Sequence, residues 1–240
     1  MNRDVFDVLF LIARPAAGKS EIIDYLRKAE AYERQRRFHI GPLDVLDDFP
    51  MLWAWFEEDA ILERMGHPRL HTNPDGYFKH EYLWHVLIER LALEYEKLRR
   101  DRRPGQERTT VVEFSRGAAH GGYQAAFQHI PVEMLRRGAI VYIHVSFEES
   151  LRKNRHRSDP ERPDSILAHS LPDEKLHRLY REVDWDTFSA GDPRFISVQG
   201  VEVPYVVFEN EDDVTTGRGP ALGSRLEEVL QRLWALRTAS

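Results

Sequence analysis

Three consecutive residues, Gly18, Lys19 and Ser20, carry the clearest chemical signal in the chain. They complete a stretch with the spacing of a phosphate-binding loop, in which four residues lie between the first position and Gly-Lys-Ser, although Ala13 stands where that pattern has glycine. In such a loop the backbone N–H groups bind polyphosphate oxygens, the lysine reaches the β- and γ-phosphates, and the serine hydroxyl ligates Mg²⁺. We therefore expect this stretch to bind a nucleotide. It consists of Ala13, Arg14, Pro15, Ala16, Ala17, Gly18, Lys19 and Ser20.

The segments on either side of this loop have the order that phosphate binding requires. Residues 5–12 form a nearly continuous apolar run, which is typical of a strand buried on both faces. After the loop, Ile22, Ile23 and Leu26 fall on one face of a predicted helix. Only a positive φ demands glycine, so Ala13 is compatible with the loop if its φ is negative.

Two further charged residues, Glu113 and Arg116, lie at the end of a second apolar run, residues 109–115. Because ligands bind at the carboxyl ends of parallel strands, Glu113 would hold Mg²⁺ or accept the proton of a hydroxyl group. Arg116 would contact an acceptor or a transferring phosphoryl group, since guanidinium geometry suits phosphate oxygens. The alternatives are a solvated carboxylate at a strand end and an arginine that solvates the glycine-rich turn after it.

Composition and charge narrow the classes of function. The chain has 240 residues, 42% of them hydrophobic and 31% charged, which is ordinary for one α/β domain with an insertion. Its net charge of -6 argues against general nucleic-acid binding. The absence of cysteine excludes disulfides and thiolate chemistry. With no signal peptide and no apolar run of membrane-spanning length, we expect a soluble, cytoplasmic protein without a membrane partner. The sequence does not indicate the oligomeric state.

Strands and helices are expected to alternate along the chain, which indicates a parallel sheet with helices on both faces. The strands are predicted at residues 5–12, 38–40, 109–115, 139–146 and 203–208. Helices are predicted near residues 53–66, 79–100, 123–137 (with a break at Pro131), 148–157, 165–195 and 226–236.

With the phosphate-loop pattern first, an acidic strand end in the middle and an arginine-rich segment after the fourth strand, the chain resembles a P-loop kinase of the adenylate-kinase-like group. The resemblance implies a three-layer P-loop NTPase fold with a mostly parallel five-stranded sheet, spanning residues 1–240 as a single domain. It also implies a helical acceptor-binding insertion at residues 41–100, ATP and Mg²⁺ as cofactors, and phosphoryl transfer to a small molecule. The stretch from Glu113 to Arg116 is loosely similar to the Glu-Arg-Ser motif of deoxynucleoside kinases. The Asp-Gly-Phe-Pro-Arg run of many nucleotide kinases is absent, so the acceptor is not identified.

The same resemblance gives a role to three arginines near the fourth strand. Arg152 and Arg155 share a helix face and Arg157 begins the following loop. In the family, arginines at this place form the base of a mobile lid, here residues 152–190, which closes on the polyphosphate and excludes water. Favourable interaction with the helix dipole is the alternative reading of these charges.

Three groups of residues have weaker interpretations. Asp44, Asp47 and Asp48 are expected in a loop, where the family binds its acceptor and a carboxylate could bind a hydroxyl group; simple loop solvation is the favoured alternative. No metal site is expected from the histidines, whose spacing fits no compact ligand set; these are His67, His71, His80 and His85. The aromatic residues of the insertion are expected to pack its helices rather than stack on a base; these are Trp53, Trp55, Phe56 and Trp84.

Two other classes of function remain open at this stage. A nucleotide-dependent switch, or a P-loop protein that hydrolyses ATP slowly, would share the phosphate loop. The guanine-specificity motif Asn-Lys-x-Asp is absent, because the stretch that begins at Asn210 lacks the lysine. A degenerate kinase fold that serves as an interaction module would explain Ala13.

Overall fold

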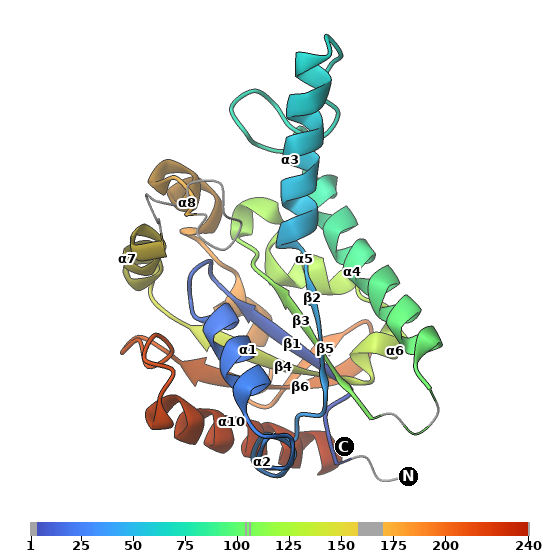
Figure 1. The fold of residues 1–240 in the computed structure, drawn as a ribbon, viewed down its shortest axis with the longest axis vertical. Helices are drawn as coiled ribbons and strands as arrows, with labels where there is room; N and C mark the ends of the chain where they lie inside the picture. The colour runs from blue at the N-terminus through green and yellow to red at the C-terminus, as the bar shows by residue number, and fades with distance from the viewer. Residues whose placement is uncertain (1–3, 104, 106, 158–169, 240) are drawn as a thin grey trace.

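One mixed sheet of six strands forms the centre of the molecule. The computed structural model describes residues 4–103, 105, 107–157 and 170–239 (Figure 1). The strands are β1 (Val8–Ala13), β2 (Leu43–Asp47), β3 (Thr109–Phe114), β4 (Gly138–His144), β5 (Phe195–Val198) and β6 (Val201–Glu209). Their order across the sheet is β2-β3-β1-β4-β6-β5, and only β5 runs antiparallel to its neighbour. The chain is therefore α/β with a mostly parallel sheet, as expected, but the expectation of five strands is wrong.

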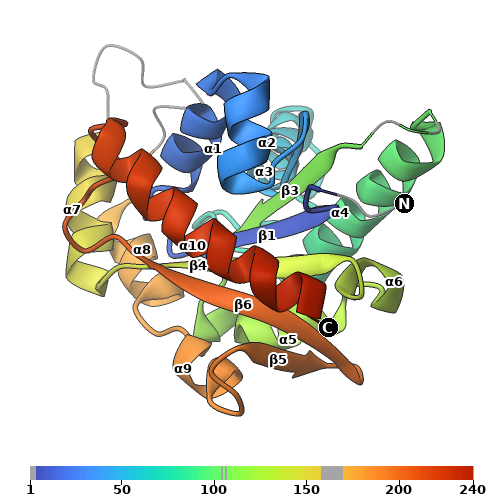
Figure 2. The same ribbon diagram turned by 90° about the horizontal axis from the view of Figure 1, so that it is seen from below.

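Helices cover both faces of this sheet and connect its strands (Figures 1 and 2). They are α1 (Lys19–Lys28), α2 (Ala31–Phe38), α3 (Phe49–Arg64), α4 (Tyr82–Asp101), the 3-10 turn η1 (Ala118–His120), α5 (Gly122–Gln128), α6 (Val132–Leu135), α7 (Phe147–Arg157), α8 (Asp173–Tyr180), α9 (Trp185–Ser189) and α10 (Pro220–Ala239). The predicted break at Pro131 is confirmed, since Pro131 precedes α6 and separates it from α5.

Strand β1 owes its central place to a sequence that is apolar on both faces. Its side chains divide between two cores: Phe10 packs with α4, α5 and α6, whereas Leu9 and Leu11 pack with α1, α2 and α10. Every residue of β1 is buried, as the continuous apolar run predicts. The sheet thus presents the carboxyl end of β1 between the carboxyl ends of its neighbours β3 and β4.

The second strand lies in a different place from the predicted one. Residues 38–40 are not a strand: α2 extends to Phe38, and His39 ends it with a left-handed φ of 54°. The strand is instead β2, whose two aspartates, Asp44 and Asp47, suggested a loop. Because β2 is an edge strand, its residues are half-exposed and carboxylates are tolerated there.

The segment predicted to be helical at residues 165–195 also differs. Among the residues described there, the structure has two short helices, α8 and α9, and then the edge strand β5. Strand β5 pairs with β6 through a tight turn at Gln199 and Gly200, both with positive φ. Its four residues are too few to show a period in the sequence.

The expected insertion at residues 41–100 contains β2 as well as α3 and α4. Helix α3 projects away from the sheet (Figure 1). The buried carboxylate of Asp59 in α3 accepts hydrogen bonds from the N–H groups of Leu70, His71 and Thr72, which fixes the loop after α3 against that helix. None of the helices described here is long and apolar enough to cross a membrane.

Candidate functional site

The phosphate-loop pattern lies between β1 and α1, at the carboxyl edge of the sheet. Ala13 is the last residue of β1, fully buried, and its φ is not positive, so this position does not require glycine. Left-handed conformations occur at Ala16, with φ 57°, and at Gly18, with φ 113°. The bend of the loop therefore falls at positions 16–18, and alanine replaces glycine where the strand is still extended.

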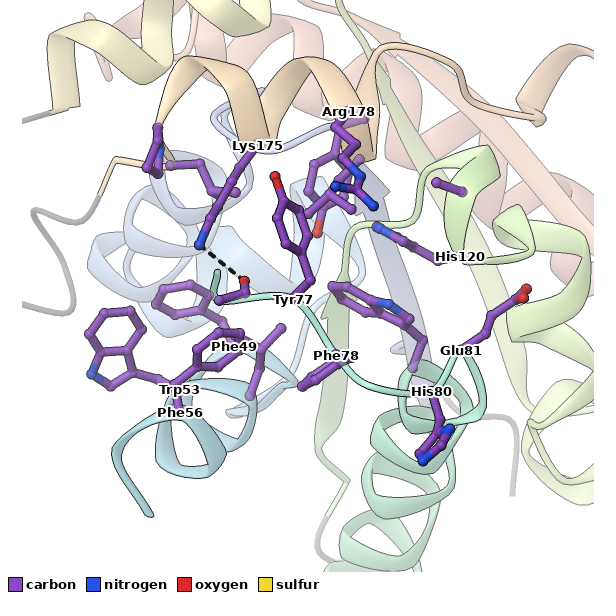
Figure 3. A pocket seen from close by; sticks show the side chains of 18 of the residues that line it. Phe49, Trp53, Phe56, Tyr77, Phe78, His80, Glu81, His120, Lys175 and Arg178 are labelled. Carbon is purple, nitrogen blue, oxygen red and sulfur yellow. Dashed lines mark hydrogen bonds between the residues drawn. The ribbon is translucent and has the colours of Figure 1, made fainter. Parts of the chain in front are cut away.

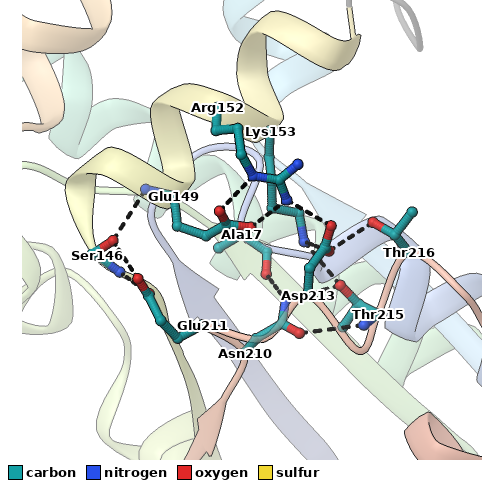
Figure 4. Close-up of polar contacts among 10 residues, drawn as sticks. All are labelled: Ala17, Ser146, Glu149, Arg152, Lys153, Asn210, Glu211, Asp213, Thr215 and Thr216. Atoms are coloured by element: carbon teal, nitrogen blue, oxygen red, sulfur yellow. Dashed lines mark hydrogen bonds and ion pairs between the residues drawn. The ribbon is translucent and has the colours of Figure 1, made fainter.

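The loop rests on a segment from the far end of the chain. The Asn210 side chain donates a hydrogen bond of 2.8 Å to the carbonyl oxygen of Ala17 (Figure 4). A Cβ atom at Gly18 would lie 2.6 Å from Oγ1 of Thr215, so this close approach requires glycine. The hydroxyl of Ser150 donates to the carbonyl oxygen of Pro15 at 2.8 Å. The conformation of the loop is consequently stabilised by contacts with α7 and with the connection between β6 and α10.

Lys19 begins α1 and turns toward the neighbouring strand. Its Nζ donates a hydrogen bond of 2.8 Å to Oγ of Ser115, the residue after β3. Strands β1 and β3 are neighbours, yet the helix after β1 packs on one face of the sheet and the helix after β3 on the other. Such a topological switch point is where open α/β sheets bind ligands. Ser20 is exposed beside it, in the first turn of α1.

Two carboxylates, Glu113 and Asp47, lie in register at the ends of β3 and β2. Glu113 is also paired with Leu11 of β1, which belongs to the core on the α1 face, so both carboxylates point toward that face. Burial and the charge of Asp48 raise the pKa of Asp47 to about 6, against the opposing effect of Lys19. A carboxyl group poised near neutral pH, beside a lysine at a switch point, is suited to proton transfer.

Arg116 is buried, and both terminal amino groups of its guanidinium are bound by protein groups. Only 1% of it is exposed, and its guanidinium donates to the carboxylate of Asp48 at 2.6 Å and to the carbonyl oxygens of Ser115 and Trp84. The guanidinium also lies over the Trp84 ring, 5.2 Å from its centroid. Arg116 therefore joins the ends of β2 and β3 to α4 and holds these elements in position. The residues around it in the sequence gave no sign of this role.

The arginines predicted to bind polyphosphate are engaged elsewhere in this structure. Arg14 donates to backbone carbonyl oxygens of Val145, Tyr180 and Arg181. Arg152 forms ion pairs with Glu149 and Asp213, which Figure 4 shows, and Arg155 pairs with Asp173. The side chain of Arg157, and residues 158–169 of the predicted lid, lie outside the described residues.

A buried lysine that sequence reasoning missed lies in the same helix. Lys153 is 5% exposed, and its ammonium group donates to Oγ1 of Thr215 and pairs with Asp213 (Figure 4). Its position between two arginines gave no sign that it points inward. It ties α7 to the segment that supports the phosphate loop.

Beside these polar groups the structure has a cavity of about 570 Å³, which we call the aromatic cavity (Figure 3). Its walls come from the start of α3, the loop before α4, η1 and α8. The lining residues are Phe49, Leu52, Trp53, Phe56, Gly76, Tyr77, Phe78, His80, Glu81, Trp84, Ala119, His120, Ser170, Leu171, Pro172, Lys175, Arg178, Leu179 and Tyr180. Trp53, Phe56 and Trp84 were expected to pack the insertion; they also form these walls.

The cavity adjoins the phosphate loop through two direct links. The N–H of Phe49, in the wall, donates a hydrogen bond of 2.9 Å to the carboxylate of Asp47. The carbonyl of Tyr180, in the opposite wall, accepts a hydrogen bond from Arg14. Helix α8 is held close by Gly117, where a Cβ atom would lie 1.8 Å from the carbonyl oxygen of Leu179. The cavity therefore lies next to the switch point, although Lys19, Asp47 and Glu113 are not among its lining residues.

His120 is the most unusual residue of the cavity wall. It is 1% exposed, stacks on Trp84 with ring centroids 3.8 Å apart, and its Nδ1 accepts the N–H of Gly117. Burial and the nearby charge of Arg116 lower the pKa of His120 to about 3, so the ring is neutral and its proton is on Nε2. Among the described residues Nε2 has no hydrogen-bond partner.

The sequence predicted the loop and Glu113 as parts of a site, but it did not predict the cavity. The cavity draws on four segments that are spread over residues 49–180 of the chain, and no local pattern predicts that they meet. The described residues contain no cluster of three or more His, Asp or Glu side chains that could hold a metal ion by themselves.

A scan of the chain against protein-family models finds no match, and a search of curated proteins finds none.

Proposed function

We propose that this protein is a P-loop kinase, which transfers a phosphoryl group from ATP to a small molecule bound in the aromatic cavity. The observation that carries the proposal is that Lys19 and the paired carboxylates Asp47 and Glu113 meet at one switch point, with a mainly apolar cavity next to it. The strand–loop–helix context of residues 13–20 supports the nucleotide side of this reading.

The residues of the loop fit the triphosphate of ATP. Helix α1 begins at Lys19, and none of the described side chains caps its N-terminus, so the first-turn amides are available to anionic oxygens. The ammonium group of Lys19 would leave Ser115 and stabilise negative charge on the transferring group.

The fit to Mg²⁺ is consistent with the donors present. Ser20 offers an exposed hydroxyl at the loop and Glu113 a buried carboxylate at the end of the neighbouring strand β3, and Mg²⁺ prefers hard oxygen ligands of this kind. Since Mg²⁺ retains several waters, two protein oxygens suffice. The ion, when bound, would neutralise phosphate charge.

Asp47 is the better placed of the two carboxylates for accepting a proton, because it adjoins Phe49 in the cavity wall and its pKa is raised to about 6. The acceptor hydroxyl would lose its proton to Asp47 as its oxygen bonds to the γ-phosphorus, and the bond from that phosphorus to the β–γ bridging oxygen would break. The products are ADP and the phosphorylated acceptor, with the proton on Asp47 released to water afterwards.

A second candidate is a nucleotide-binding protein that transfers no phosphoryl group. It is favoured by the ion pairs of Arg152 with Asp213 and of Arg155 with Asp173, which occupy the guanidinium groups that a kinase lid would use. In the kinase reading these pairs exchange for phosphate oxygens when ATP binds, because charge-assisted contacts to phosphate are the stronger ones.

Transfer of label from γ-labelled ATP to a library of small molecules tests the proposal. Acceptor-dependent transfer is expected with the wild type and with Lys28→Ala, a matched control that removes an exposed lysine of the same helix. Lys19→Ala is expected to transfer at the background rate. If all three proteins bind ATP and none transfers label to any acceptor above hydrolysis, the non-catalytic reading replaces the kinase.

A further inference from the structure

The side chains that line the aromatic cavity restrict the chemistry of the ligand that it can bind. Flat rings from α3 and from the loop before α4 face it, among them Phe49, Phe56 and Phe78 (Figure 3). Trp84 of α4 also lines the cavity. Aromatic walls favour flat apolar ligands, which stack on them or meet them edge to face. An extended flexible chain would gain less from such walls.

Two cations stand on one side of this apolar space, both on α8. Lys175 is half-buried and donates a hydrogen bond of 3.0 Å to the carbonyl oxygen of Gly76; Arg178 is exposed, with its guanidinium 4.2 Å from the centroid of the Tyr77 ring. Figure 3 shows both side chains extending from α8 toward the loop that carries Tyr77. Tyr77 thus lies beneath two positive charges.

The charges of this pair are not balanced locally. Across the part of the chain that the structure describes, neither Lys175 nor Arg178 forms an ion pair with a carboxylate, whereas Arg152 and Arg155 both do. Stacking on Tyr77 leaves the edge of the Arg178 guanidinium free to bind oxygen atoms bidentately. Two adjacent cations without carboxylates favour an anionic group on whatever fills the space beside them.

A third polar group, on η1 where it packs against α8, has no partner among the described residues. The Nε2–H of His120 is buried in the cavity wall and donates to no described residue. A buried donor that is left unpaired destabilises the native state, and such a group calls for an explanation. An acceptor atom on the ring system of a ligand would supply the missing partner.

We infer that the acceptor of the proposed kinase is a planar aromatic molecule bearing an anionic group, with its ring among the aromatic walls and its anion between Lys175 and Arg178. The inference rests on the proposed function for the word acceptor, but the ligand class rests on the cavity alone. Carboxylate and phosphate share the required chemistry, since both present two or more anionic oxygens to a guanidinium.

A pair of fluorescent probes with matched rings tests this class. The anionic probe 8-anilino-1-naphthalenesulfonate and the neutral N-phenyl-1-naphthylamine share one ring system and differ in the sulfonate. Titrations of the folded protein without ATP are expected to give one site for each probe, with the anionic probe bound more tightly. Arg178→Gln and Lys175→Gln are each expected to lower the affinity for the anionic probe by about tenfold or more, because each removes one charge-assisted contact. Each is expected to lower the affinity for the neutral probe by less than twofold.

Arg181→Gln is the matched control, because Arg181 is an exposed arginine directly after α8 that does not line the cavity. It is expected to change neither affinity. If Arg181→Gln lowers the affinity for the anionic probe as much as the other two variants do, the probe is attracted by the overall charge of the surface. If neither Arg178→Gln nor Lys175→Gln lowers that affinity, the cavity does not select anions. Either result overturns the inference. So does the absence of a single probe site.

Displacement of the bound anionic probe separates the two sources of the charge. We expect 1-naphthoate or 1-naphthyl phosphate, whichever matches the natural group, to compete more strongly than neutral 1-naphthol. Equal competition by all three overturns the requirement for an anion. Lys19→Ala is expected to retain probe binding in every case, so a failure of the kinase proposal in the transfer assay leaves this result intact, and the reverse holds too.

Discussion

Replacing Asp47 with asparagine separates the chemical role of this residue from its structural one. Asparagine keeps the size of the side chain and the oxygen that accepts the N–H of Phe49 at 2.9 Å. It loses the negative charge and the capacity to accept a proton. Activity and stability are therefore expected to change in opposite directions, which is a signature of a residue selected for function.

The effect on activity follows from the raised pKa of Asp47. With a pKa of about 6, the ionised fraction at pH 5 is about one tenth of its value at high pH, whereas an aspartate with its ordinary pKa of 3.8 would remain ionised. Wild-type kcat/KM is thus expected to fall about tenfold from its plateau to pH 5. In Asp47→Asn the fall of kcat/KM at acidic pH should disappear. The plateau value of kcat/KM at high pH should drop by about 10²–10⁴-fold, which is the usual contribution of a general base.

The effect on stability has the opposite sign. The native state holds the Asp47 proton up to about pH 6 but the unfolded chain loses it near pH 3.8, so this residue lowers stability progressively as pH rises between these values. One pKa unit corresponds to about 1.4 kcal/mol, which puts the full cost above pH 6 at up to about 3 kcal/mol. Asp47→Asn should remove that cost, with about half of the gain remaining at pH 5 and none below pH 3.8.

Urea unfolding at pH 5 and pH 8, without nucleotide, measures the second effect, and initial rates of phosphoryl transfer across the same range measure the first. Glu57→Gln is a suitable control, since it removes an exposed carboxylate from α3. A variant that loses activity and also loses stability at pH 8 would refute the reasoning, because Asp47 would then be a structural partner of Lys19. Unchanged turnover with an intact acidic limb would assign the limb to another group.

Three further perturbations test the remaining parts of the site. Lys19→Ala is expected to weaken binding of ATP with Mg²⁺ by about 1.5–3 kcal/mol in a folded protein; calorimetry that finds wild-type affinity removes Lys19 from the phosphate site. Glu113→Gln is expected to raise the Mg²⁺ requirement if Glu113 is a metal ligand, with part of the activity returning at high Mg²⁺, or to lower turnover about 10²–10⁴-fold at every Mg²⁺ concentration if it is the base. Arg116→Met leaves the carboxylate of Asp48 buried without its cation and should lower the free energy of unfolding by about 3–5 kcal/mol; denaturant titration should show recovery when Asp48→Leu is added, and no recovery would mean that Arg116 acts through other partners.

Long apolar runs and strong helical periods made most of the fold predictable. Strand β1 and helix α4 lie close to their expected positions because burial on one or two faces leaves a regular pattern in the sequence. Strand β2 could not be found in this way, since an edge strand with a carboxylate at each end has the composition of a loop. The consequence was functional, because Asp47 belongs to that strand and its pairing with Glu113 was hidden.

The ion pairs of the site also could not be predicted from local patterns in the sequence. Arg152 meets Asp213, and Arg116 meets Asp48, across distances in the chain that no helical or strand period connects. An arginine is available to bind phosphate only if the fold does not already place a carboxylate beside it. The sequence indicated which residue types would gather at the carboxyl edge of the sheet, and the fold decided which of them were already paired.

The bond between Asn210 and Ala17 has a consequence for the order of events during synthesis. The bend of the phosphate-loop pattern is supported by a side chain that is synthesised 193 residues after it. A nascent chain that ends before β6 lacks this support, so the loop can reach its final shape only after β6 and Asn210 have been made. Products truncated before Asn210 would then carry the motif without its conformation.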